Sequence, residues 1–123
     1  MQKLFLLLGS ISGIIAVAIG AFGAHGLKDF LTKTGRLETF ETAVKYQFYH
    51  TFAILIVALL LDKYNNKLLQ YSGYSFLTGI ILFSGSLYIL IATQNTKLGA
   101  ITPLGGLFFI AGWVLMASVA FKG

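Results

Sequence analysis

The sequence predicts an all-α fold, an integral membrane bundle of four transmembrane helices with an amphipathic surface segment between the first two. Three observations predict it. The chain of 123 residues is 57% hydrophobic and 11% charged, whereas about a quarter of the residues in a soluble domain are charged. The charges stand between long uncharged runs. Each run is long enough for a helix to cross a hydrocarbon core of about 30 Å. We therefore expect one transmembrane domain over residues 1–123.

The first span is expected at residues 4–24, which contain no charged side chain and have the length of a membrane-crossing helix. A cleaved signal peptide is the alternative. The run is longer than the usual apolar stretch of about 7–15 residues and carries small packing residues, so we expect it to be retained. Residues 27–44 then mix apolar and charged side chains at helical spacing. This pattern indicates an amphipathic segment at the bilayer surface, broken near Gly35.

The remaining spans follow from the next three apolar runs. The second span is expected at residues 45–62, in a helix that starts outside the membrane near Leu37. A polar turn separates it from the third span at residues 71–92, and a tight connection around Lys97 leads to the fourth at residues 101–121. Short connections make consecutive helices antiparallel neighbours.

Composition excludes several classes of function. The chain has no cysteine, two histidines and four carboxylates, so a disulfide framework and a thiolate metal site are excluded. We predict no metal and no cofactor. The nine Lys and Arg residues give a net charge of +5, but they are dispersed among the apolar runs instead of forming one strip, so no nucleic-acid partner is expected. Membrane lipids, through their anionic headgroups, are the expected partners.

Orientation follows from the same cations. They are nearly balanced between the two faces of the membrane, which weakens the positive-inside signal. The long first connection mixes its cations with Asp29, Glu38 and Glu41. On that basis we expect both termini in the cytoplasm of a bacterial cell, with the chain in its inner membrane.

A histidine in the second span is the main candidate for chemistry. His50 follows Tyr46 by one helical turn, and polar groups at that depth face the bundle interior. A proton relay, a metal ligand and a lipid-headgroup contact are possible roles; the alternative is a neutral histidine bonded to a tyrosine or serine of another helix. Glu41 and Lys45 are spaced for an ion pair. The candidate polar or ligand site comprises His25, Glu41, Tyr46, His50, Ser84, Ser86 and Tyr88. No acid, base and nucleophile combine in the sequence, so an enzyme is not expected.

Small residues recur at helical spacing in the first and fourth spans. Such stripes let two helices approach closely in lipid. In the first span the partner is either a second copy of the chain or another helix of the same bundle. In the fourth, the Gly105-Gly106 pair permits close packing or a helix break of the kind that forms binding sites. The glycines expected to pack are Gly9, Gly13, Gly20, Gly105, Gly106 and Gly112.

Several segments together resemble a family of small membrane proteins whose eukaryotic members are called transmembrane protein 256, with domain of unknown function 423. They are Gly20-Ala21-Phe22-Gly23-Ala24-His25, Tyr46 with His50-Thr51, Leu82-Phe83-Ser84-Gly85-Ser86-Leu87-Tyr88, Thr102-Pro103-Leu104-Gly105-Gly106 and Ala111-Gly112-Trp113. The resemblance covers nearly the whole chain. It implies a bacterial inner-membrane protein with four spans, and it brings no activity or ligand residue.

Two functions are therefore considered, and the first is the favoured one. The first is a non-enzymatic module that packs with itself as a homo-oligomer, with lipid or with a partner protein. The second is a small transporter or an ion- or proton-conducting oligomer, with a polar path near His50.

Overall fold

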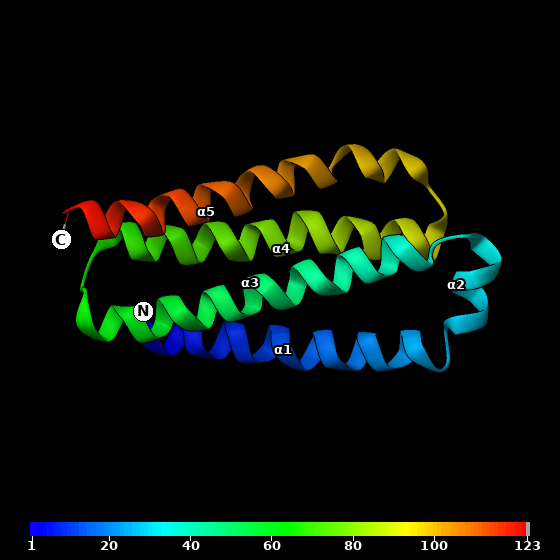
Figure 1. The fold of residues 1–123 in the computed structure, drawn as a ribbon, viewed down its shortest axis with the longest axis horizontal. Coiled ribbons are helices and arrows are strands. Elements are labelled where there is room, and N and C mark those ends of the chain that lie inside the picture. The colour runs from blue at the N-terminus through cyan, green and yellow to red at the C-terminus, as the bar shows by residue number, and fades with distance from the viewer. Residues whose placement is uncertain (123) are drawn as a thin grey trace.

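The computed structural model describes residues 1–122, which fold into four long antiparallel helices with two short helical connections (Figure 1). The elements are α1 (Gln2–Ala24), α2 (Lys28–Thr34), α3 (Leu37–Lys63), α4 (Lys67–Thr93), the 3-10 helix η1 (Thr96–Ala100) and α5 (Thr102–Lys122). Each long helix is long and apolar enough to cross a membrane. The predicted all-α class is confirmed, and α3 begins at the expected Leu37.

The long helices pack in chain order. Figure 1 shows α3 and α4 side by side, with α1 against α3 and α5 against α4. The largest fully buried side chains include Phe5, Phe76, Ile54, Leu69 and Val57. Large apolar side chains also cover the outer surface, among them Leu59, which is 71% exposed, and Ile14, which is 68% exposed. An apolar exterior of this extent is suited to contact with lipid chains.

The amphipathic connection is a short helix that ends at a glycine. α2 stops at Gly35, whose φ of 68° is left-handed, and the backbone N–H of Arg36 returns to the carbonyl of Leu31 at 2.9 Å. This is the usual geometry for a glycine that ends a helix. Leu31 is fully buried and packs with Phe40 of α3, while Asp29 is exposed. The predicted break near Gly35 and the amphipathic character are therefore confirmed.

The small-residue stripe of α1 faces α3 within the same chain. A Cβ added to Gly9 would lie 2.6 Å from Cδ2 of Leu55, and Ser12 and Ala16 on the same side are buried. Added Cβ atoms on Gly13 and Gly20 would meet α3 side chains at ordinary contact distances of 3.7 and 3.6 Å. The stripe therefore packs α1 against α3 of the same chain, which is the intramolecular alternative given above.

The two adjacent glycines of α5 differ, because Gly105 packs against α4 and Gly106 does not. α5 runs without interruption from Thr102 to Lys122, so the helix break that these glycines permitted does not occur. A Cβ on Gly105 would lie 2.7 Å from Cα of Phe83, which brings α4 and α5 into close contact. A Cβ on Gly106 would meet nothing within 4 Å, so the expectation that Gly106 packs is wrong: it points away from α4. Gly112 packs against Phe76.

Candidate functional site

His50 lies at the contact between α3 and α5, where both of its ring nitrogens are hydrogen-bonded. Nδ1 lies 2.8 Å from the backbone oxygen of Tyr46, and Nε2 lies 3.1 Å from the indole Nε1 of Trp113. A carbonyl oxygen only accepts and an indole N–H only donates. Nδ1 therefore carries the proton, Nε2 accepts from Trp113, and His50 is neutral. Of the alternatives that the sequence left open, this arrangement fits the neutral histidine bonded to another helix, but the partner is a tryptophan and not the expected tyrosine or serine.

Aromatic rings hold the imidazole in place. The His50 ring stacks on Phe109 with a centroid distance of 3.5 Å and an interplanar angle of 7°. Phe76 approaches from α4 at 5.7 Å and also contacts Trp113 edge-on at 4.8 Å. His50 is 5% exposed. Its position is thus fixed by stacking as well as by hydrogen bonds.

A groove opens beside this histidine between α3 and α5. Its volume is about 470 Å³, and its lining consists of Tyr46, His50, Pro103, Gly106, Leu107, Phe109, Ile110 and Trp113. Tyr46 and Trp113 are 39% and 43% exposed, and Ile110 is 60% exposed. The exposed side chains around the groove are apolar, so its opening lies on the surface suited to contact with lipid chains. Ligand sites in proteins commonly have volumes of about 300–1,000 Å³.

A second polar cluster joins three helices. Ser12 of α1 and Thr51 of α3 share a hydrogen bond of 2.7 Å, and Nε2 of Gln47 donates to the backbone oxygen of Ser12 at 3.0 Å. The hydroxyl of Tyr88 on α4 donates to Oε1 of Gln47 at 2.6 Å. The sequence interpretation missed Ser12 and Gln47, although a polar side chain within an apolar run was a signal for both.

The two serines of α4 have separate partners. Ser84 is fully buried and its hydroxyl donates to the backbone oxygen of Ala43 at 2.7 Å. Ser86 shares a bond of 2.6 Å with the hydroxyl of Thr102 on α5. Ser84 therefore links the third span to the second, while Ser86 links the third span to the fourth. Both hydroxyls strengthen helix contacts.

The two histidines do not share a site. His25 is exposed at the C-terminal end of α1, in a shallow recess formed with Phe22 and Gly26. His50 instead contacts α5. Glu41 lines a separate groove between α1 and α3. Within residues 1–122, no three His, Cys, Asp or Glu side chains come together to hold a metal ion.

The candidate polar residues therefore divide among several helix contacts. Among the described residues, every buried side-chain nitrogen and oxygen has a hydrogen-bond partner. Buried polar groups that are satisfied in this way stabilise a particular helix arrangement. Of the candidate polar residues, Tyr46 and His50 share one groove, the one between α3 and α5.

This architecture defines a small helical membrane protein with four apolar spans, and comparison with known proteins gives the same class. A family model described as "Protein of unknown function (DUF423)" matches residues 19–106. The chain belongs to this family, as the sequence resemblance indicated. It is 45% identical to the UPF0382 membrane protein YwdK of Bacillus subtilis (strain 168) over 98% of each chain.

Further relatives support the membrane assignment. A UPF0382 membrane protein of Haemophilus influenzae is 43% identical over 99% of this chain and 97% of its own. The UPF0382 membrane protein SAB0533 of Staphylococcus aureus is 43% identical over 98% of each chain. No solved structure shows significant similarity to the chain. The protein is thus an integral membrane protein of a family whose description assigns it no activity.

Proposed function

We propose that the chain is a non-catalytic module of the bacterial inner membrane that binds a lipid acyl chain in the groove between α3 and α5. The observation that carries this proposal is the groove itself, with a volume of about 470 Å³ and exposed apolar residues along it. An acyl chain reaches such an opening from within the bilayer, without crossing water. Apart from His50 and the Tyr46 hydroxyl, the groove is lined by apolar side chains and by glycine.

The chemistry of His50 supports an apolar ligand. Both ring nitrogens are already bonded within the protein, so the imidazole presents a neutral wall to the groove. The Phe109 ring stacked against it is 4% exposed, which gives that wall a rigid backing. A preformed surface costs little conformational entropy when a flexible chain binds.

The hydrogen bonds of the buried polar groups support a structural role for these groups and not a catalytic one. Ser12, Gln47, Thr51 and Tyr88 bond to one another, and Ser84 bonds to a backbone carbonyl. Each of these groups joins two helices. Self-association is not part of this proposal, because the α1 stripe is used inside the chain.

The chain's one tryptophan lies in the groove and provides the test. In detergent, phosphatidylcholine with brominated acyl chains, titrated from below to above one equivalent, should quench Trp113 fluorescence and saturate near one lipid per chain. Gly106→Leu fills the groove, since a side chain there meets open space, and should abolish the saturable quenching. Gly85→Leu is the matched control, because a Cβ there would have its nearest contact at 3.9 Å, with the backbone oxygen of Ile80 on α4 itself. Saturable quenching that survives in Gly106→Leu would exclude the groove.

The proposed orientation has both termini in the cytoplasm. The chain lacks cysteine, so single cysteines report topology without background. Asn65 is exposed between α3 and α4, and Lys97 is exposed at the other end of the bundle. In intact spheroplasts, a membrane-impermeant maleimide should label Lys97→Cys and should label Asn65→Cys only after lysis. The reverse pattern would place the termini outside.

A further inference from the structure

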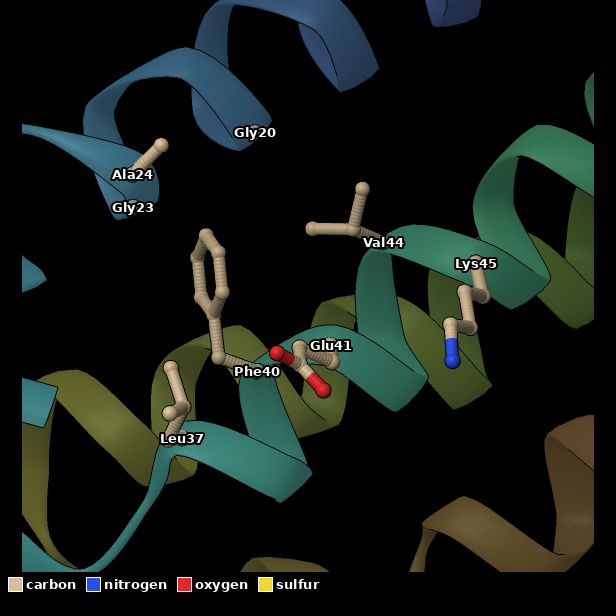
Figure 2. Close-up of a pocket in the computed structure, with 8 residues that line it drawn as sticks. All are labelled: Gly20, Gly23, Ala24, Leu37, Phe40, Glu41, Val44 and Lys45. Atoms are coloured by element: carbon tan, nitrogen blue, oxygen red, sulfur yellow. The ribbon is translucent and has the colours of Figure 1, made fainter. Parts of the chain in front are cut away.

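A second groove lies between the C-terminal end of α1 and the first turns of α3 (Figure 2). Its volume is about 400 Å³. Figure 2 shows Phe40 and Val44 pointing from α3 towards α1, with Glu41 and Lys45 on the same stretch of α3. The lining consists of Gly20, Gly23, Ala24, Leu37, Phe40, Glu41, Val44 and Lys45. An apolar recess therefore borders on one negative and one positive side chain.

The two charges stand at different depths in the membrane. Lys45 directly precedes the uncharged part of α3, which continues to Leu61, whereas Glu41 lies one helical turn nearer the start of the helix. One turn of an α-helix rises about 5.4 Å. Lys45 thus lies at the edge of the hydrocarbon, and Glu41 lies farther out. Both side chains are exposed.

We propose that this groove binds the headgroup of a zwitterionic phospholipid with a primary ammonium group, of which phosphatidylethanolamine is the common example. In that lipid the phosphate is next to the glycerol and the ammonium is farther out, joined by a two-carbon link. Lys45 binds the inner phosphate and Glu41 binds the outer ammonium. The order of charges along α3 matches the order along the lipid, and both contacts are charge-assisted hydrogen bonds.

The same arrangement discriminates against other headgroups. Phosphatidylglycerol offers a phosphate to Lys45 but no cation to Glu41, whose carboxylate then repels the anionic lipid. Phosphatidylcholine carries a quaternary ammonium without an N–H, so it donates no hydrogen bond to Glu41. The recess formed by Gly20, Ala24 and Val44 receives the first carbons of the acyl chains. This site is separate from the groove beside His50 and does not depend on it.

Native mass spectrometry of the purified full chain tests the proposal. The chain is incubated in detergent with equal amounts of phosphatidylethanolamine and phosphatidylglycerol that have identical acyl chains. The wild type should retain phosphatidylethanolamine about tenfold more, the scale of one charge-assisted hydrogen bond. Glu41→Gln should bring the ratio near one, and Lys45→Gln should lower retention of both lipids. Equal retention by the wild type would overturn the proposal.

Matched controls separate this site from general charge effects. Glu38→Gln removes a carboxylate that lies one turn before Glu41 but lines a different recess with Thr39 and Thr102. Lys97→Gln removes a cation at the same end of the bundle. Both variants should keep the wild-type ratio, and so should Gly106→Leu, which tests the other groove.

A charge swap distinguishes lipid recognition from a simple ion pair between the two side chains. Glu41→Lys with Lys45→Glu keeps both charges and their spacing, but reverses their order with respect to the bilayer. The preference for phosphatidylethanolamine should disappear in this double variant. Retained preference there, or in Glu41→Gln, would show that the lipid order is not recognised by these residues.

Discussion

The indole N–H of Trp113 donates to Nε2 of His50 at 3.1 Å, and this bond joins α3 to α5 across the edge of α4. The main packing contacts of α5 are with α4, so the bond is a specific polar link in a largely apolar contact. It also leaves the histidine without charge in a region surrounded by lipid. A charged side chain at the centre of a bilayer costs about 2.5–3.5 kcal/mol on insertion scales.

Trp113→Phe should destabilise the bundle by about 1 kcal/mol, because Nε2 of His50 loses its donor while the aromatic contact with Phe76 is largely kept. Combined with His50→Phe, a double-mutant cycle should give a coupling energy of about 0.6 kcal/mol, the average for polar pairs in membranes. Reversible unfolding in mixed micelles with SDS measures these free energies. A coupling energy of zero would mean that the bond contributes no stability.

Adjacent glycines in α5 should respond differently to alanine. In Gly105→Ala the new methyl group meets the backbone of Phe83, so α4 and α5 must separate; forced overpacking costs about 1–3 kcal/mol. In Gly106→Ala the methyl group meets open space and stability should change little. The same unfolding assay compares the two variants. Equal effects would contradict the close contact at Gly105.

Tyr88→Phe should lower stability by about 1 kcal/mol, because Oε1 of the buried Gln47 loses the hydroxyl that donates to it and is left without that hydrogen bond. Tyr71→Phe is the control. Tyr71 is on the same helix but is 55% exposed, and its substitution should have little effect. Thermal unfolding in detergent, followed by circular dichroism, ranks the two variants. The cluster would have no structural role if they were equally stable.

Gly35→Ala should loosen the joint between α2 and α3. The φ of 68° at this position is unfavourable for alanine by about 1–2 kcal/mol, whereas Gly35→Asn should be milder because asparagine tolerates the left-handed conformation. Hydrogen exchange of α2 amides should quicken in the alanine variant, while exchange in α3 stays slow. Unchanged exchange in α2 would contradict the strain argument.

The spans were predictable from sequence because the thickness of the bilayer sets the length of an apolar run. Gly35 was also predictable, since it interrupts an amphipathic pattern. The contacts between particular side chains of different helices were harder to predict from the sequence. In a soluble protein the polar face of a helix shows which side is buried, but in lipid both faces are apolar. The rotation of α5 that brings Trp113 to His50 therefore leaves little trace in the hydrophobic pattern.

The close glycine contacts show the same limit. Spacing identified Gly9, Gly105 and Gly112, which are in tight contact, but it also selected Gly106, which faces open space. Spacing alone missed Gly73. A Cβ added to Gly73 would lie 2.6 Å from the ring of Phe5, so these two residues are in tight contact. The tight fit there depends on an aromatic ring from a distant helix. This contact joins residues far apart in the sequence, so no local sequence pattern predicts it.

The polar contacts also have an order in time. The spans are synthesised one after another, so Ser12 of the first has Thr51 as a partner only once the second is made. The third then brings Tyr88 to the free oxygen of Gln47, and the last brings Trp113 to Nε2 of His50. Each newly inserted helix satisfies an atom left open by an earlier one. A chain halted before its last span carries a bare imidazole nitrogen in hydrocarbon, which distinguishes it chemically from a finished protein.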